Sequence, residues 1–339
     1  MASEVLFIVN PISGNRKQKH IKGLLEKWLN FELFDPTIVF TKCQNHATEL
    51  SRNAIGKYDY VVAVGGDGTV NEVANGLIGS NVVMGIIPVG SGNGLARHLN
   101  IPMNTAEAIK VLNKNLVMPI DTIDINGTTS VNVSGIGFDA HVAHKFASNG
   151  KRGPIPYVKI TTTEFQQYHS QKYKVTVDGK TRTEDAFLIS FANSAQFGNN
   201  IFIAPEAKIN DGLIDVCIME EFPIVDAPIL ATRLINKTIH KSQYLKTYRY
   251  SKLTIEASNY PILCHIDGEP KKFDTKLEIE IKPASLKIIY NNEQQIWVIT
   301  TIEKEIMNLL NEQSSRAKTL INKASEILKI KRKPPQITK

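Results

Sequence analysis

The sequence predicts an α/β domain built on a parallel sheet, followed by an antiparallel β-sandwich. Up to about residue 120, short apolar runs alternate with segments of helical periodicity, which is the pattern of a parallel sheet with crossover helices. From about residue 129 to residue 290, apolar and polar residues alternate with a period of two, as in antiparallel strands. With 339 residues, 42% of them hydrophobic, the chain can bury a large core and divide into two domains.

The individual elements follow from these patterns. Four strands are expected in the first domain, at Val5–Val9, Thr37–Phe40, Tyr60–Val64 and Val83–Pro88. In the second domain, residues 173–177 alternate before an Asp178-Gly179 turn, residues 277–281 alternate in the same way, and helices are expected near 154–168 and 224–237. We place the domains at residues 1–125 and 126–296, with residues 297–312 returning to complete the first domain and residues 313–339 forming a basic amphipathic tail.

The third expected strand leads into a glycine-rich turn and then a helix, Gly-Gly-Asp-Gly-Thr-Val-Asn-Glu-Val-Ala-Asn-Gly-Leu at residues 65–77. Glycines allow close approach of a ligand to the backbone, and the first turn of a helix presents N–H groups that favour a phosphate. Asp67 would repel that phosphate unless a metal ion stood between them, so the turn suggests a Mg²⁺-nucleotide. A plain strand-to-helix turn is the alternative for the first four residues taken alone.

At its full length this motif resembles the diacylglycerol kinase catalytic domain, the lipid-kinase family that also holds sphingosine, ceramide and bacterial lipid kinases. The resemblance covers about residues 4–300 and implies a Rossmann-like nucleotide-binding domain facing a β-rich domain, with ATP and Mg²⁺ as cofactors. It also implies that the loop after the first strand and the threonine after the second contact the nucleotide. The implied nucleotide-binding residues are Asn10, Pro11, Ser13, Gly14, Asn15, Thr41, Gly65, Gly66, Asp67, Gly68, Thr69, Val70, Asn71 and Ser91.

Ser91 belongs to a third glycine loop, at residues 88–97 after the fourth strand. Arg97, one turn into the next helix, either faces phosphate or is a solvated surface side chain. The loop departs from many bacterial members of the family, because Gly94 stands where they carry an Asp that helps hold a metal-water network. In this respect the chain is more similar to the sphingosine and ceramide kinases. Asp121 is a further candidate for that network.

Residues 204–215 resemble the structural Mg²⁺ loop of the family. By position, its ligands would be the carboxylate of Asp211 and groups contributed at Lys208 and Leu213. A Lys side chain is cationic and a Leu side chain is apolar, so only their backbone carbonyls are suitable oxygen donors for Mg²⁺. A simple Asp-Gly hairpin is the alternative.

Two carboxylates flank a glycine in Asp267-Gly268-Glu269. Phosphoryl transfer to an alcohol needs a carboxylate that can take the hydroxyl proton, and the resemblance assigns this role to the Asp-Gly-Glu element. We favour Glu269 as the base, with Asp267 as its partner or as the base itself. The sequence does not separate the two, and a polar β-turn between sandwich strands is the alternative.

Residues 133–140 fit the G-x-G-x-x-A dinucleotide fingerprint, but they lie in the antiparallel half without a βαβ unit, so we do not expect NAD to bind there. The three cysteines are far apart and indicate neither a disulfide framework nor a zinc site. No apolar segment is long enough for a membrane span or a signal-peptide core. A cytoplasmic location is therefore expected.

The net charge is +7, and residues 301–339 carry nine Lys or Arg against four Glu, so +5 of that charge lies in the tail. A basic amphipathic segment can lie on an anionic membrane, and the alternative is that residues 301–312 pack on the first domain and the rest is a solvated end. The expected partner is a lipid substrate at the membrane surface, at the inner face, with the tail as a peripheral membrane contact. Nucleic acid is not expected as a partner, and a homodimer is left open.

The sequence thus predicts an ATP-dependent lipid kinase, with diacylglycerol as the first candidate substrate and a sphingoid base or ceramide next. An NAD kinase-like enzyme acting on a soluble metabolite is one alternative, because such enzymes also carry Gly-Gly-Asp-Gly. A catalytically weak lipid-binding or regulatory protein is the other, because of Gly94.

Overall fold

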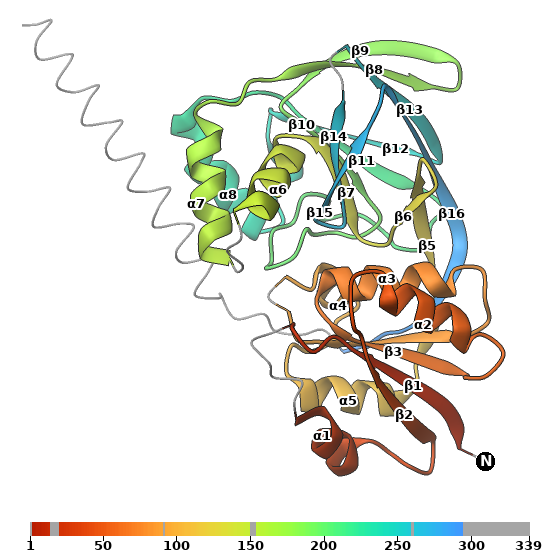
Figure 1. Cartoon of the computed structure of the whole chain (residues 1–339). Coiled ribbons are helices and arrows are strands. Elements are labelled where there is room, and N and C mark those ends of the chain that lie inside the picture. Colours follow the sequence, from red (N-terminus) through yellow and green to blue (C-terminus); the bar gives the residue numbers. More distant parts are fainter. Residues whose placement is uncertain (1, 14–19, 91, 150–153, 259–260, 294–339) are drawn as a thin grey trace, which may run out of the picture.

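The computed structural model describes residues 2–13, 20–90, 92–149, 154–258 and 261–293, and it divides into an α/β part and a β-rich part (Figure 1). The α/β part contains four parallel strands in the order β2-β1-β3-β4. Their bounds are β1 (Ser3–Val9), β2 (Phe34–Phe40), β3 (Tyr60–Gly65) and β4 (Val83–Pro88). All four expected strands are present, and β2 starts three residues earlier than expected, because Pro36 is tolerated on an edge strand.

Helices cover both faces of this parallel sheet (Figure 1). On one face lie α1 (Ile21–Trp28) and α5 (Thr105–Lys114), and on the other α2 (His46–Ala54) and α3 (Asp67–Leu77). The short helix α4 (Gly94–His98) follows β4. Because both faces are covered, the central strands read as continuous apolar runs, and residues 61–65 of β3 are all buried.

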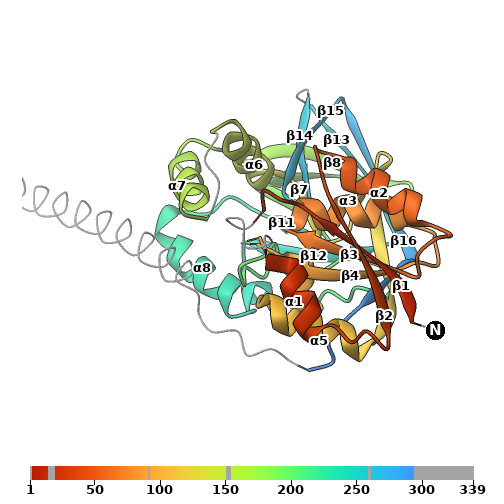
Figure 2. The same cartoon turned by 60° about the horizontal axis from the view of Figure 1, so that its bottom comes forward.

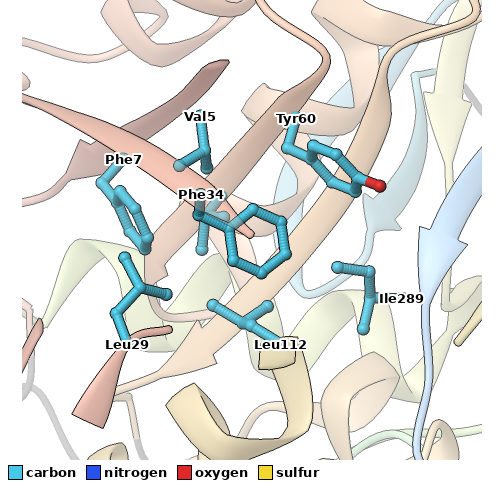
Figure 3. A pocket seen from close by; sticks show the side chains of 8 residues that line it. Val5, Phe7, Leu29, Phe34, Tyr60, Leu112 and Ile289 are labelled. Carbon is cyan, nitrogen blue, oxygen red and sulfur yellow. The ribbon is translucent and has the colours of Figure 1, made fainter. Parts of the chain in front are cut away.

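The core beneath α1 and α5 is tightly packed. Figure 3 shows Val5, Phe7, Phe34 and Tyr60 of the strands meeting Leu29, Leu112 and Ile289, and no room for a water molecule is left between them. The rings of Phe34 and Tyr60 meet edge to face, with centroids 5.2 Å apart. This apolar pocket is therefore part of the core. A ligand is instead expected at the carboxyl ends of the parallel strands.

Two antiparallel layers form the β-rich part. One is a six-stranded sheet in the order β12-β11-β10-β7-β14-β15, and the other is the far half of a ten-stranded sheet. Apolar side chains such as Phe191, Ile255 and Ile279 are fully buried between the layers. The strands of the six-stranded sheet are β7 (Val133–Gly137), β10 (Leu188–Ala192), β11 (Ile214–Met219), β12 (Leu245–Tyr250), β14 (Ile262–Ile266) and β15 (Glu269–Phe273).

The ten-stranded sheet joins the two parts, because β16 (Lys276–Ile289) runs through both. Its first half pairs with β13 (Lys252–Ala257), and its last residues, Lys287 and Ile288, lie parallel to Val83 and Met84 of β4. β5 (Val117–Ile125) accompanies β16 along most of this path. The other strands of this sheet are β6 (Thr128–Ser130), β8 (Gln171–Val177) and β9 (Lys180–Ala186). The segments expected at residues 297–312 and 313–339 lie outside the described residues.

Three hairpins of the β-rich part turn on an Asx-Gly pair with positive φ at both residues. These are Asn126-Gly127, Asp178-Gly179 and Asp267-Gly268, with φ values of 48° and 78°, 49° and 74°, and 49° and 91°. Each pair links strand residues that face one another, as in a two-residue type I′ turn. The expected Asp178-Gly179 turn is thereby confirmed, and the same chemistry shapes the hairpin that carries the Asp-Gly-Glu element.

The remaining helices gather on one flank of the β-rich part (Figure 2). They are α6 (Phe138–Ser148), α7 (Pro154–Phe165), η2 (Ile224–Asp226), α8 (Ala227–Ile235) and η3 (Ile239–Lys241). The two expected helical interruptions correspond to α7 and to η2 with α8. Of the helices in the described part of the chain, none is both long and apolar enough to cross a membrane.

Candidate active site

The carboxyl ends of the parallel strands bring together the first of the positions that were predicted to contact a nucleotide. The N–H of Asn10 donates to the carbonyl of Val64 at 3.0 Å, and the N–H of Thr41 donates to the carbonyl of Val9 at 2.9 Å. The Asn10 side chain then reaches the glycine turn, where its Nδ2 donates to Thr69 Oγ1 at 3.0 Å. The loop after β1, the end of β2 and the start of α3 therefore meet at one edge of the sheet, as ligand sites in such sheets do.

Other residues that were predicted to bind the nucleotide contribute less to this arrangement. Pro11 and Ser13 continue the turn that starts at Asn10, and the side chain of Val70 is buried in the core. Gly14, Asn15 and Ser91 lie outside the described residues.

The first turn of α3 begins at Asp67, directly after the glycine turn. Gly66 precedes the helix, and no side chain within the described residues caps it. The first N–H groups of a helix have no partner inside the helix, so they favour a negatively charged ligand. Gly65 is needed for this turn, since a Cβ there would lie 2.4 Å from the Thr69 side chain.

Asp67 joins the glycine turn to the next glycine loop. Its Oδ2 accepts from the N–H of Asn93 at 2.8 Å, and its Oδ1 accepts from the N–H of Gly94 at 2.9 Å. The two loops also touch through glycines, because a Cβ on Gly90 would lie 2.8 Å from the Cα of Gly66. Burial raises the pKa of Asp67, while the two backbone hydrogen bonds lower it. Asp67 therefore positions a second loop, a role that its place in the sequence does not suggest.

Arg97 supports the same loop from inside. It is buried, its Nε donates to the carbonyl of Gly92 at 2.9 Å, and its Nη1 donates to Asn200 Oδ1 at 3.3 Å. It is therefore not a solvated surface side chain.

Gly94 is required by its surroundings. A Cβ at this position would lie 2.4 Å from Asn132 Nδ2 and 2.9 Å from the carbonyl of Phe197. The Asn132 side chain, hydrogen-bonded to Ser194, occupies the space into which an Asp would project. Gly94, which stands where many bacterial members carry an Asp, is thus matched by Asn132, a residue far away in the sequence.

Asp267 holds the β14–β15 hairpin against both parts of the protein. Its Oδ1 accepts from Ser130 Oγ at 2.6 Å and from the N–H of Asn132 at 3.0 Å. Its Oδ2 accepts from the N–H of Val131 at 2.9 Å and from Asn71 Nδ2 at 2.8 Å. Burial raises the pKa of Asp267, and these donors lower it. With both oxygens engaged and the residue only 7% exposed, Asp267 is an organiser of the site.

Glu269 has the opposite environment. It is the first residue of β15, directly after the Asp267-Gly268 turn, and it is exposed. Its Oε1 lies 3.3 Å from the position that a Cβ on Gly68 would occupy, so its carboxylate faces the glycine turn of α3. The structure therefore separates two carboxylates that the sequence leaves equivalent.

The expected metal loop is exposed at Lys208 and Asp211, and Asp211 Oδ1 accepts from the N–H of Leu213 at 3.1 Å. Asp121 holds this loop, since its Oδ2 accepts from the N–H of Gly212 at 2.7 Å and its Oδ1 from the N–H of Ala284 at 2.7 Å. Asp121 thus uses its oxygens in the same way as Asp67, to tie separate segments together.

Ser130 and Asn132, which donate hydrogen bonds to Asp267, were not among the residues predicted from the sequence. Both are small polar residues that follow the Asn126-Gly127 turn, and nothing local marks them as functional. Their importance comes only from the hairpin that folds back onto them from more than 130 residues away.

Comparison with known proteins agrees with this architecture. The family model described as diacylglycerol kinase catalytic domain matches residues 4–125, and the one described as YegS C-terminal NAD kinase beta sandwich-like domain matches residues 132–290. A diacylglycerol kinase of Bacillus subtilis (strain 168) is 27% identical over 271 residues, covering 77% of this chain and 88% of its own. A Pseudomonas aeruginosa protein named "Probable lipid kinase YegS-like" is 28% identical over 235 residues, covering 68% of this chain and 76% of its own.

A solved diacylglycerol kinase structure from Bacillus anthracis str. Sterne has the same fold, with a TM-score of 0.64, 24% identity, and coverage of 86% of this chain and 97% of that one. The expected combination of a parallel α/β domain and an antiparallel sandwich is confirmed. The two matched domains follow one another along the chain and meet at the glycine turn and the Asp-Gly-Glu hairpin. The chain therefore belongs to the diacylglycerol kinase catalytic domain family, with a YegS-type C-terminal domain.

Proposed function

We propose that this protein transfers the γ-phosphate of ATP to the hydroxyl group of a membrane lipid, with diacylglycerol as the first candidate and a sphingoid base or ceramide next. The observation that carries the proposal is the approach of Glu269 Oε1 to the glycine turn at Gly68. At this point the carboxylate of Glu269, from the second domain, faces the first turn of α3 in the first domain, whose N–H groups favour an anion. This is the arrangement that a base needs to deprotonate a hydroxyl beside a bound phosphate.

The roles of the two carboxylates follow from their surroundings. Glu269 is exposed, so its carboxylate is accessible to a substrate hydroxyl and can take up the proton. Asp267 is buried and accepts from Asn71, Ser130, Val131 and Asn132. It holds the hairpin so that Glu269 stays beside the glycine turn. Asp67 acts on the nucleotide side, where it keeps Asn93 and Gly94 of the loop after β4 against the turn.

The donors in the metal loop fit Mg²⁺. Asp211 offers an exposed carboxylate, and the backbone carbonyls of Lys208 and Leu213 would complete an oxygen set. Asp215 lies in the same acidic neighbourhood as Asp211, and its buried Oδ2 has no partner among the described residues. Arg249 Nε pairs with Asp215 Oδ1 at 3.0 Å, which leaves Asp211 as the exposed carboxylate that would bind a cation. Mg²⁺ bound with ATP would neutralise charge on the transferred phosphoryl group.

A lipid substrate places the enzyme at a membrane. We infer a cytoplasmic protein that touches the inner face of the membrane peripherally, through the basic residues 313–339.

The deciding experiment is transfer of labelled γ-phosphate from ATP with Mg²⁺ to a panel of lipids in anionic vesicles, with NAD as a parallel acceptor. Glu269→Gln is the test variant, and Glu256→Gln, an exposed carboxylate on β13, is the matched control. We expect a single labelled lipid whose labelling is lost in Glu269→Gln and kept in Glu256→Gln. Labelling of NAD instead would favour a soluble-metabolite kinase. ATP binding without any labelled lipid would favour a regulatory protein.

A further inference from the structure

The glycine-rich segment at residues 133–140 fits a dinucleotide fingerprint in sequence, yet it forms the end of β7 and the start of α6 in the antiparallel part. It brings Asp139 beside His265, two residues before Asp267. We propose that Asp139 and His265 are positioning residues that hold the Asp267-Gly268 turn, and through it Glu269, in place. The inference rests on the proposed function, because it assigns a task to the base named there.

The sheet makes room for the Asp139 carboxylate at a single residue. Gly135 of β7 lies opposite His265 of β14, and a Cβ on Gly135 would lie 2.4 Å from Asp139 Oδ2 and 2.9 Å from the carbonyl of Ile189. Gly137, with φ of 96°, starts α6 in a backbone conformation that other residues rarely adopt. Gly135 therefore makes room for Asp139, and Gly137 is required by the carbonyl of Phe187, from which a Cβ would lie 2.6 Å. These contacts account for the two glycines without a dinucleotide.

The hydrogen bonds define one tautomer of His265. Its Nδ1 accepts from the N–H of Gly268 at 3.2 Å, so Nδ1 carries no proton. Its Nε2 then carries the proton and donates to Asp139 Oδ2 at 3.2 Å. Asp139 Oδ2 also accepts from Ser190 Oγ at 3.3 Å. A carboxylate that receives Nε2–H keeps Nδ1 available as an acceptor, just as an Asp fixes the tautomer of a His in a catalytic triad.

The consequence falls on Glu269, because Gly268 is the residue directly before it. Without the acceptor at Nδ1, the Gly268 N–H loses its partner and the turn is held from the Asp267 side alone. Gly268 is exposed, so water can reach its N–H, but a water molecule does not fix the turn as the buried ring of His265 does. A shift of about 1 Å in the base is enough to lower turnover about 100-fold.

Four variants test this. Asp139→Asn can present an amide N–H to Nε2 and so favour the wrong tautomer. His265→Asn keeps an acceptor oxygen near the position of Nδ1, whereas His265→Gln keeps only the contact toward Asp139. His144→Gln is the control, because His144 also joins α6 to the β14–β15 hairpin, through the carbonyls of Cys264 and Lys271, without touching the turn.

We expect kcat to fall about 10- to 100-fold in Asp139→Asn and His265→Gln, with an unchanged KM for ATP, because the glycine loops are untouched. His265→Asn should retain more kcat than His265→Gln, and His144→Gln should retain the wild-type value. Equal losses in His265→Asn and His265→Gln, or wild-type kcat in Asp139→Asn, would overturn the proposal.

A readout independent of activity is the tautomer of His265 in the full chain, measured by ¹⁵N NMR of histidine-labelled protein. The expected result is an Nε2–H tautomer that changes in Asp139→Asn, with faster amide exchange at Gly268. An Nδ1–H tautomer in the wild type refutes the positioning role. If no lipid is phosphorylated at all, the proposed function fails while the tautomer and the Gly268 exchange still decide the geometry.

Discussion

The separation of Asp267 from Glu269 gives the sharpest prediction. Asp267→Asn converts a carboxylate that accepts at both oxygens into an amide that accepts at one end only. Whichever way the amide turns, its NH₂ group meets a backbone N–H, that of Val131 or that of Asn132. One buried donor then has no acceptor, and hydrogen bonds to a charged group are replaced by weaker ones.

The magnitude follows from these contacts. A hydrogen bond to a charged group contributes about 1.5–3 kcal/mol, and a buried donor left unpaired costs about 1–3 kcal/mol. For Asp267→Asn we therefore expect a loss of about 3–5 kcal/mol in the free energy of unfolding. Glu269 is exposed, so Glu269→Gln should change the free energy of unfolding by no more than about 0.5 kcal/mol. It should lower kcat by about 10²- to 10⁴-fold, because it removes the proton acceptor.

The assay is urea unfolding followed by circular dichroism, alongside γ-phosphate transfer, for both variants and the wild type. The expected pattern is a lower unfolding midpoint in Asp267→Asn and an unchanged midpoint with lost turnover in Glu269→Gln. The reasoning is refuted if Asp267→Asn unfolds like the wild type yet has no activity, since Asp267 would then be the group that takes the proton.

Three further predictions concern residues around this site. Gly68→Ala should leave the unfolding midpoint unchanged or raise it, because Ala favours helix, but should lower kcat in the transfer assay, because the new Cβ would lie 3.3 Å from Glu269 Oε1. Gly94→Asp should lower the free energy of unfolding, measured by urea titration, by about 1–3 kcal/mol, because its Cβ would lie 2.4 Å from Asn132 Nδ2. It should not increase turnover, and a stable variant with higher activity would contradict this. Burial lowers the pKa of His98 from 6.5 to about 4, so only the unfolded chain takes up a proton in that range. Stability should thus be fully present above pH 6.5 and fall by about 2–3 kcal/mol toward pH 4, a slope that His98→Asn should flatten in urea titrations at several pH values.

Much of the fold could be predicted because its signals are local. Apolar runs such as residues 60–64 are buried strands, since both faces of a parallel sheet are covered by helices. The Asp178-Gly179 pair forms the expected hairpin turn, because these residue types tolerate positive φ. The strand at residues 277–281 was expected, but the link that it makes between the α/β part and the β-rich part was not predicted. β16 reads as one alternating strand, and nothing in residues 276–289 indicates that its last part would lie against β4.

The sequence by itself determined the family, the parallel and antiparallel halves, and the glycine turn with the Asp-Gly-Glu element, because each is written in consecutive residues. Only the tertiary structure decided what each carboxylate does. Asp67, Asp121 and Asp267 all tie distant segments through backbone N–H groups, and Glu269 alone among these four residues is exposed beside the glycine turn. Donors and burial come from segments far apart in the chain, and they set the chemistry of a carboxylate more than its neighbours in sequence do.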